Sequence, residues 1–572
     1  MSLIAVALVS AACLLAAYAV YGRLLSRLLR LDPEATTPAV ELRDDVDYSP
    51  IAPGFLLSQH FSAIAAAGPI VGPILAGAAF GWGPALIWIL LGSIFIGGVH
   101  DMTALVASIR HRARSIAEVV REHMSPRSYL LFLVFIWITL VYIIVAFTDI
   151  TAASFTGVQV LEDGERVSGG GIATSSLLYL VLPMIMGVCL RYTKLSLGWA
   201  TVIFLPLVAA IIWVGQRIPL DLGQVLGVSE LTAHQVWNTA LVLYCLVAAV
   251  VPVWLLLQPR GHLGGYFLFA ALLVGVAGFV VPGRKIEYPA FIGFTSEQGK
   301  SLFPILFITI ACGACSGFHA LIASGTTSKQ LRRETDARSV GYGSMLLEAM
   351  VAIIALSCVM VLPAGSALAK REPNLIYASG IGAHWGPFWV SFGLMAFTTF
   401  VYDTLDVCTR LGRYILQEVT GWRGWRGKWF ATALTAGAPL YFLLGAETGP
   451  DGKRIQVWRT FWELFGASNQ LLAALTLLGV TVWLWRSRGA WWVWLVTGVP
   501  MAWMYSMSFW ALVGIVTRAR PPAAPSFDLV GGLSIVLLAL ALLMLIEAAV
   551  VILGPRTRPP RRDEPRPVPA AA

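Results

Sequence analysis

The sequence predicts an all-α polytopic membrane protein with about 15 transmembrane helices, two of which are interrupted. The chain has 572 residues, of which 58% are hydrophobic and only 12% are charged, whereas about 25% of residues are charged in soluble domains. Apolar runs of about 20 residues, long enough to cross the hydrocarbon core, recur along most of the chain. Two of these runs are rich in Gly, Pro or other small residues and are expected to break. These observations leave no room for a substantial soluble domain.

Hydropathy and length place each expected span in order along the chain. The first begins at the N-terminus but is too long, and is followed by too many others, to be only a cleaved signal peptide. The expected spans lie near residues 2–24, 55–80, 84–108, 129–153, 172–190, 195–216, 236–257, 264–282, 301–324, 341–363, 385–409, 429–445, 461–485, 490–515 and 528–553.

The distribution of Lys and Arg predicts the orientation, because positively charged loops stay in the cytoplasm. Basic stretches follow the first, third, ninth, eleventh and fifteenth spans, so the N-terminus is expected outside and the C-terminus inside a plasma membrane. The loop "ETGPDGKRIQVWR" does not fit this scheme. The net charge of +9 then belongs to loops that face an anionic leaflet, with no need for nucleic acid. The basic tail, residues 556–572, is expected to be disordered.

No enzyme or cofactor motif is present in the sequence. It contains no GxxxxGK[ST] phosphate loop, no HExxH and no GxSxG. Cys312 and Cys315 have C-x-x-C spacing but no second pair, so we expect neither a metal nor a cofactor. Uphill transport would therefore draw on an ion gradient or on a partner chain. Secondary transporter, channel and intramembrane enzyme remain as classes, and the missing motifs weigh against the enzyme.

The second span, "HFSAIAAAGPIVGPILAGAAF", is expected to break in mid-membrane. Pro69 and Pro73 each remove a helix N–H, and Gly68 and Gly72 allow the chain to leave helical dihedrals. Unwound backbone in a membrane is costly unless it lines a polar cavity or is buried in protein. A proline kink accommodated by neighbouring helices is the alternative.

The ninth span, "FPILFITIACGACSGFHALIASGTTSKQL", is the second candidate for a break. It carries Gly313, Gly317, Gly325 and the ionisable His319. Close helix packing through small residues is the alternative explanation for the glycines. In the assigned orientation this span runs opposite to the second one.

A pair of interrupted helices of opposite polarity is typical of transporters built from inverted repeats around a midplane site. The expected division is an N-terminal helix and loop (1–54), a transporter core (55–485), two C-terminal peripheral helices (486–555) and the tail (556–572). Within the core, the repeats are expected at 55–216 and 301–485, separated by two inserted spans at 236–282. Half-helix N-termini favour an anion, so a carboxylate substrate is expected.

Ionisable residues inside membrane spans are costly unless they are paired or functional. Candidates for proton coupling are Asp403, Asp406, Glu348, His60 and Asp101. Candidates for substrate binding are Gly68, Pro69, Gly72, Ser316, Gly317, His319 and Asn469.

Asp403, Asp406 and Arg410 share one face of the eleventh span, at spacings i, i+3 and i+7. An Asp406–Arg410 pair within the helix is the structural alternative to proton coupling. For the histidines and for Asn469 the alternative is a hydrogen bond between helices.

Several blocks of the sequence resemble, in collinear order, the carbon starvation protein A family. They include "HFSAIAAAGPIVGPILAG", "GWGPALIWILLGSIFIGGVHDM", "ACSGFHALIASGTTSKQL", "GYGSMLLEAMVAI", "DTLDVCTRLGRY" and "WELFGASNQLLAALTL", and the resemblance extends from about Pro53 to Leu478. The stretch "QPRGHLGGY" departs from the family pattern, but it is expected in a cytoplasmic loop, away from the core chemistry.

The resemblance implies a bacterial inner-membrane transporter with a leucine-transporter-like core, used in scavenging under nutrient limitation. Members are described as proton-driven pyruvate uptake systems and as peptide uptake systems. We therefore expect proton-coupled uptake of a small carboxylate such as pyruvate, with Na⁺ as the alternative coupling ion. Peptide uptake is the alternative substrate class, and a starvation sensor that does not transport is the alternative of another class.

Overall fold

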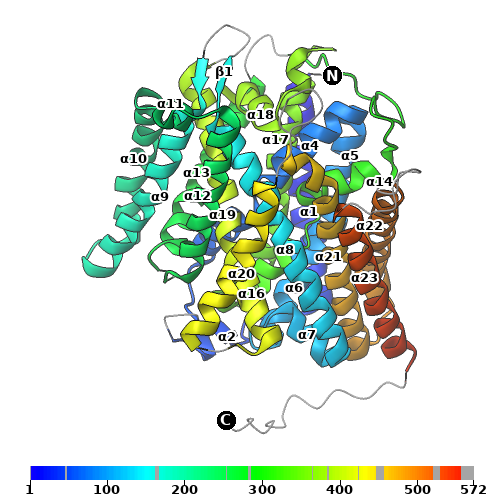
Figure 1. Cartoon of the computed structure of the whole chain (residues 1–572). Helices are drawn as coiled ribbons and strands as arrows, with labels where there is room; N and C mark the ends of the chain where they lie inside the picture. Colours follow the sequence, from blue (N-terminus) through cyan, green and yellow to red (C-terminus); the bar gives the residue numbers. More distant parts are fainter. Residues whose placement is uncertain are drawn as a thin grey trace.

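The computed structural model describes residues 2–44, 48–160, 166–252, 254–280, 285–363, 365–382, 385–422, 424–445, 456–518 and 529–554. These residues form a bundle of helices with one short antiparallel hairpin, β1 (Val158–Val160) and β2 (Arg166–Ser168), at one end (Figure 1). The predicted all-α membrane class is confirmed. The tail expected to be disordered, residues 556–572, lies outside the described residues.

The helices follow one another as predicted from the apolar runs. The α-helices are α1 (Leu3–Leu29), α2 (Pro38–Glu41), α3 (Pro53–Ile64), α4 (Gly68–Phe80), α5 (Trp82–Gly92), α6 (Gly98–Arg110), α7 (Ile116–His123), α8 (Pro126–Phe155), α9 (Gly169–Tyr192), α10 (Leu197–Arg217), α11 (Leu222–Leu226), α12 (Glu230–Val250), α13 (Leu257–Val280), α14 (Leu302–Thr309), α15 (Ala311–Ala314), α16 (Phe318–Gly325), α17 (Ser344–Met360), α18 (Pro373–Gly382), α19 (Pro387–Thr420), α20 (Gly424–Leu444), α21 (Val457–Arg488), α22 (Val499–Arg518) and α23 (Leu529–Leu553). Short π or 3₁₀ segments are η1 (Ser93–Gly97), η2 (Thr327–Lys329), η3 (Glu334–Asp336), η4 (Arg338–Gly343), η5 (Ala367–Lys370) and η7 (Trp494–Gly498).

Fewer helices meet the length and composition needed to cross a membrane than the sequence predicted. Among the described residues, 12 helices are long and apolar enough to cross a membrane, and α3 with α4 adds a thirteenth as a pair bent by 51°. The two remaining expected spans correspond to the three short helices α14 to α16 and to α20. The count of about 15 is therefore not confirmed, although every expected range coincides with helix.

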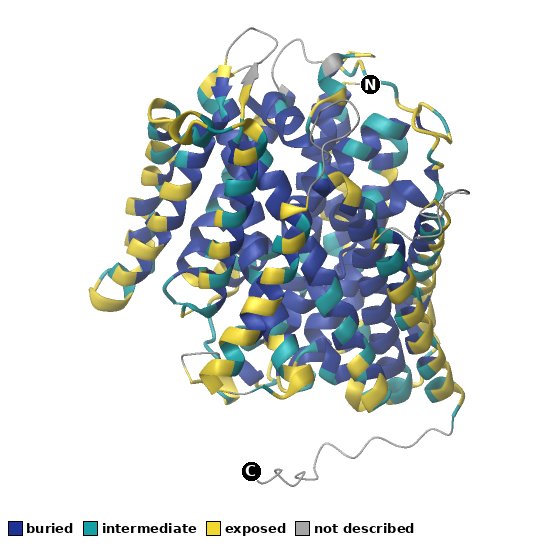
Figure 2. Cartoon of the chain, in the orientation of Figure 1, coloured by how far each residue is buried: buried dark blue, intermediate teal, exposed yellow. Residues whose placement is uncertain are grey.

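Burial separates a central group of helices from a peripheral one (Figure 2). The most apolar window of α21 is 100% buried and that of α19 is 89% buried, whereas the windows of α10 and α23 are each 22% buried. Helices with exposed apolar faces are those that would meet lipid. The helix α1 begins at the upper end of the bundle and α23 ends at the lower end, where α2 and α7 lie (Figure 1). The direction of this axis in the cell, and the division into repeats, stay predictions.

The second span is interrupted, but not at the Gly-Pro pairs themselves. The helix α3 ends at Ile64, the chain is non-helical at residues 65–67, and Gly68 and Pro69 open α4. Proline is well placed in the first turn of a helix because the N–H that it lacks has no partner there. Pro73 lies inside α4 without ending it. The expected unwinding within "GPIVGP" is corrected to the three alanines before it.

The ninth span is interrupted twice. The helix α14 ends before Ile310, and α15 ends before an extended Cys315. The helix α16 then begins at Phe318. Small residues in this run allow the backbone to turn in the protein interior.

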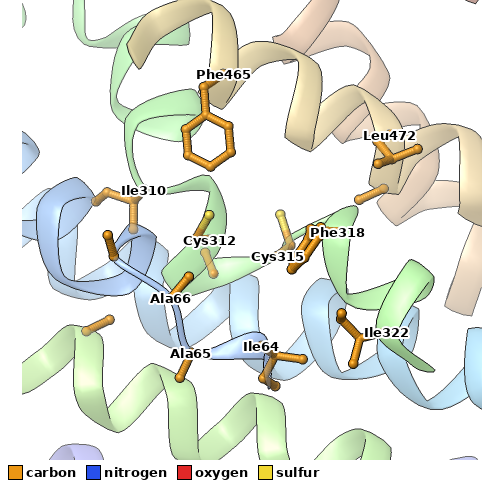
Figure 3. Packing of buried hydrophobic residues seen from close by; sticks show 14 of the residues in the cluster. Ile64, Ala65, Ala66, Ile310, Cys312, Cys315, Phe318, Ile322, Phe465 and Leu472 are labelled. Carbon is orange, nitrogen blue, oxygen red and sulfur yellow. The ribbon is translucent and has the colours of Figure 1, made fainter. Parts of the chain in front are cut away.

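The breaks of the second and ninth spans meet. A Cβ atom added to Gly68 would overlap the side chain of Cys312, and one added to Gly72 would overlap the carbonyl oxygen of Thr309. In Figure 3 the side chain of Ala66 lies next to that of Cys312, where the two broken spans cross. The absence of side chains at these glycines lets two interrupted backbones pack against each other, as small residues do between membrane helices.

Candidate functional site

A buried arginine joins two carboxylates in the protein interior. Arg260 of α13 is 1% exposed. Its Nε donates to Oδ1 of Asp403 at 2.6 Å, and its Nη1 forms an ion pair with Oδ2 of Asp406. Both acids lie on α19, three residues apart, so one helix face presents them together. One guanidinium therefore balances two carboxylates.

Neighbouring hydroxyl groups hold the two carboxylates in place. The hydroxyl of Ser62, on α3, donates to Oδ2 of Asp403 at 2.9 Å. The hydroxyl of Tyr244, on α12, donates to Oδ2 of Asp406 at 2.8 Å and accepts from Arg260. Three helices beside α19 thus contribute to this group, which we call the Arg260 cluster: Ser62, Tyr244, Arg260, Asp403 and Asp406.

The charge of the Arg260 cluster gives it a chemical property. With both acids ionised, the group carries a net charge of −1 in a buried site, which is costly. One proton on either carboxylate makes it neutral. The cluster can therefore exchange a proton, or accept another anion in place of one acid.

One expectation and one alternative about this region are wrong. The stretch "QPRGHLGGY", residues 258–266, is not a loop: it lies in the first turns of α13, and its arginine is buried. Arg410 does not pair with Asp406, because its Nη2 donates to the carbonyl oxygens of Ala248 and Val251 at 2.6 and 2.7 Å. Carbonyl groups in the last turn of a helix have no partner within the helix, so the C-terminal end of α12 attracts this arginine.

A cavity of about 1100 Å³ connects the Arg260 cluster to one end of the bundle. Three of its lining residues, Arg260, Asp403 and His60, are buried and form its inner part. Its outer lining includes Arg114, Glu118 and Lys329, from the stretches where basic residues gather. In the orientation predicted from the charge of the loops, this mouth is the cytoplasmic one.

A second buried group of charges lies beside the broken ninth span. His319 of α16 places Nδ1 2.8 Å from Oδ2 of Asp101 and Nε2 3.1 Å from Oε2 of Glu348. Nδ1 of His100 lies 2.7 Å from Oδ1 of Asp101. Asp101 and His100 belong to α6, and Glu348 belongs to α17. We call these four residues the His319 cluster; all are fully or almost fully buried.

His60 stands between the cavity and the broken helices. Its Nδ1 lies 2.8 Å from Oγ1 of Thr327, just beyond the end of α16. The same helix, α3, carries Ser62, which binds Asp403. A shift of α3 would therefore change contacts both with the ninth span and with the Arg260 cluster.

The polar residues expected to bind substrate at the second break are satisfied by one another. The side-chain oxygen of Asn469 accepts from the Phe318 N–H at 3.0 Å, so it caps the N-terminus of α16. The backbone oxygen of Asn469 accepts from the Gly317 N–H at 3.1 Å. The side chain of Asn469 also bonds to the hydroxyl of Ser316. A role of these groups in binding substrate stays a prediction, as it does for Gly68, Pro69 and Gly72 at the first break.

Apart from His60, which lines the cavity, the structure divides the predicted site residues among three places. Asp403 and Asp406 join the Arg260 cluster, Asp101, His319 and Glu348 join the His319 cluster, and the glycines, Ser316 and Asn469 lie at the crossing of the breaks. The sequence did not identify Arg260, Tyr244 or Ser62. One signal for Arg260 was present, since it is the only Asp, Glu, Lys or Arg between residues 231 and 283.

Interrupted membrane helices that meet in the protein interior, with buried charges at the inner end of a cavity, define a membrane transporter. The chain belongs to the carbon starvation protein family: the family model described as "Carbon starvation protein CstA" matches residues 1–383 and 374–511.

Two relatives and one solved structure illustrate these similarities. The "Peptide transporter CstA" of Bacillus subtilis is 33% identical over 94% of this chain and 95% of its own. The "Pyruvate/proton symporter BtsT" of Escherichia coli is 31% identical over 87% of this chain and 79% of its own. A manganese transporter of Eremococcus coleocola superposes over 89% of this chain and 99% of its own, with a TM-score of 0.45 and 14% identity.

Proposed function

We propose that the protein takes up a small carboxylate such as pyruvate together with a proton across the bacterial plasma membrane. The observation that carries this proposal is the Arg260 cluster, in which one buried guanidinium holds two carboxylates at the inner end of a cavity. Guanidinium groups bind carboxylates through paired, charge-assisted hydrogen bonds. A substrate carboxylate can therefore take the place of Asp403 or Asp406 on Arg260.

This exchange supplies a coupling mechanism. The aspartate displaced from Arg260 would be a buried anion without its cation, which costs far more than the neutral acid. It takes up a proton, so substrate and proton enter the site together. When substrate leaves, the aspartate gives up its proton and pairs with Arg260 again.

The remaining predicted residues act along the path. His60 lines the cavity. The His319 cluster serves as a second proton site, because it has one excess negative charge when His319 is protonated and both acids are ionised. Gly68, Pro69, Gly72, Ser316, Gly317 and Asn469 are proposed to line the substrate path when the breaks open, after Asn469 releases its partners. Carboxylates and freed backbone carbonyls also bind Na⁺, which stays the alternative coupling ion.

Peptide uptake is the second candidate function. One supporting observation is the volume of the cavity, about 1100 Å³, which exceeds the upper end of the roughly 300–1000 Å³ typical of pockets for drug-sized ligands. The other is the similarity to the Bacillus subtilis relative named "Peptide transporter CstA". A peptide would place its carboxylate on Arg260 and its chain in the wider part of the cavity.

Uptake into proteoliposomes separates these functions. We expect labelled pyruvate to accumulate when a pH gradient is imposed, and the accumulation to stop when a protonophore collapses the gradient. Replacing the pH gradient by a Na⁺ gradient tests the alternative ion. Accumulation of a labelled dipeptide without any of pyruvate would establish the second candidate and overturn the first.

A further inference from the structure

The ends of α6 and α7 bring together two histidines and a glutamate at the mouth of the cavity. His111 follows α6, and Glu122 and His123 end α7. One nitrogen or oxygen atom from each of the three side chains lies within 4.8 Å of the others. His111 and His123 are partly exposed and Glu122 is exposed, so solutes from the aqueous phase can reach them.

The hydrogen bonds of His111 fix which of its ring nitrogens can bind a ligand. Nδ1 of His111 lies 2.6 Å from the carbonyl oxygen of Ala107, which can only accept a hydrogen bond. Nδ1 therefore carries a proton, and in the neutral imidazole Nε2 presents its lone pair. An imidazole whose other nitrogen donates to a carbonyl is the usual arrangement of a histidine metal ligand.

The lone pair of His111 points toward a second imidazole nitrogen. Nε2 of His111 lies 2.8 Å from Nε2 of His123, and the two rings meet edge to face. The backbone oxygen of His123 accepts a hydrogen bond from Arg486, and the ring of His111 packs against Trp483. Both ligands are thus anchored to α21, the most deeply buried span.

We propose that His111, Glu122 and His123 form a binding site for a divalent transition-metal ion, with Zn²⁺ as the best fit. Two imidazoles and one carboxylate are a ligand set that zinc uses, with water in the fourth position of a tetrahedron.

The position of the site gives the metal a regulatory effect. Glu122 lines the cavity, as do Ser115 to Glu118 and Arg121 on the same short helix. The helix α6 leads from His111 back to Asp101 of the His319 cluster. A metal ion that joins His111 to Glu122 and His123 fixes α7 relative to α6, so it holds the mouth of the cavity in one state and slows transport. This effect rests on the proposed transport function, whereas the binding does not.

Calorimetric titration of Zn²⁺ into the purified full-length protein tests the site directly. We expect one bound ion per chain, and at least roughly a tenfold loss of affinity in His111→Ala and His123→Ala, since even an outer-shell partner of a metal contributes 10–100-fold. Glu122→Gln, an exposed and conservative change, is expected to weaken binding without affecting folding. Glu118→Gln on the same helix is the matched control and should bind Zn²⁺ as the wild type does.

Two further results decide the proposal. Co²⁺ titration should give the visible absorption bands of a tetrahedral site in the wild type and not in His123→Ala. The proposal is overturned if the wild type binds no Zn²⁺, or if its affinity is unchanged in His111→Ala and Glu122→Gln, which would make the His111–His123 contact a hydrogen bond only. If Zn²⁺ binds but does not change uptake, only the regulatory effect is overturned. If Zn²⁺ binds and the protein transports neither pyruvate nor peptide, the proposed function is overturned and the metal site stands.

Discussion

Arg260 and Asp403 face each other in the protein interior, with 2.6 Å between Nε and Oδ1, although 143 positions separate them in the sequence. Asp406 occupies the other side of the same guanidinium. A single buried cation with two anionic partners is an arrangement in which a third anion can compete. Under the proposed function, that third anion is the substrate carboxylate.

Removal of the arginine should abolish transport and weaken the fold. Arg260→Gln leaves two carboxylates without their cation, and breaking a buried pair in this way costs about 3–5 kcal/mol. We expect no uptake of pyruvate and a clearly lower melting temperature in detergent. Arg121→Gln, which breaks a pair with a half-exposed arginine, is the control and should change stability by less than about 1 kcal/mol. Wild-type uptake in Arg260→Gln would remove the basis of the proposed mechanism.

Neutralising either acid should separate proton coupling from substrate movement. In Asp406→Asn and Asp403→Asn the amide cannot take up the proton, so we expect pH-driven accumulation of substrate to be lost in at least one of them. Exchange of internal for external substrate, which needs no net proton movement, should persist in that variant. Glu463→Gln changes a surface pair with Lys300 and Arg518 and serves as the control. Accumulation at wild-type rates in both aspartate variants would show that other groups carry the proton.

The crossing of the two broken spans should not tolerate a methyl group. In Gly68→Ala the new Cβ meets the side chain of Cys312, and overpacking of this kind costs about 1–3 kcal/mol. The melting temperature should fall in Gly68→Ala and recover in part in Gly68→Ala/Cys312→Gly. Gly514→Ala on α22, where a Cβ would meet nothing within 4 Å, is the matched control. Equal melting temperatures for Gly68→Ala and Gly514→Ala would contradict the observed crossing.

The His319 cluster should behave as one electrostatic unit. His319→Gln removes the group that stands between Asp101 and Glu348, so two buried carboxylates lose their shared partner. We expect a loss of stability and of uptake. Adding Glu348→Gln removes one of the acids and should restore stability but not uptake, because effects within one network are not additive. Thermal melting and uptake of the two single variants and the double variant measure the coupling, and simple additivity of the melting shifts would argue against a unit.

Local composition was enough to predict the helices and the membrane, because spans are long apolar runs whose backbone groups must be satisfied within the helix. It also identified both interrupted spans, since Gly, Pro and small residues act on the backbone where they stand. The exact position of the first break could not be predicted from the sequence. Pro69, in the first turn of α4, and Pro73, inside it, both follow a glycine, so the sequence around them does not distinguish the two. Only packing against the ninth span decides which of the two prolines follows the break.

Sequence reasoning selected the acids of the site but missed their cation. The spacing of Asp403 and Asp406 is a property of one helix and can be counted. Arg260 lies in "QPRGHLGGY", where Pro, His and Gly lower the hydropathy of the run and make it read as a loop. Its burial is favourable only because two carboxylates from another helix meet it, and no local pattern contains that pairing.

The sequence by itself determined the class of protein, the helical segments, the two interruptions and the carboxylates that the membrane makes costly. The tertiary structure decided which charges meet: Arg260 with Asp403 and Asp406, His319 with Asp101 and Glu348, and Arg410 with the end of α12. Helix formation depends on neighbours a few residues apart, whereas the stability of a buried charge depends on a partner that only the packed fold supplies.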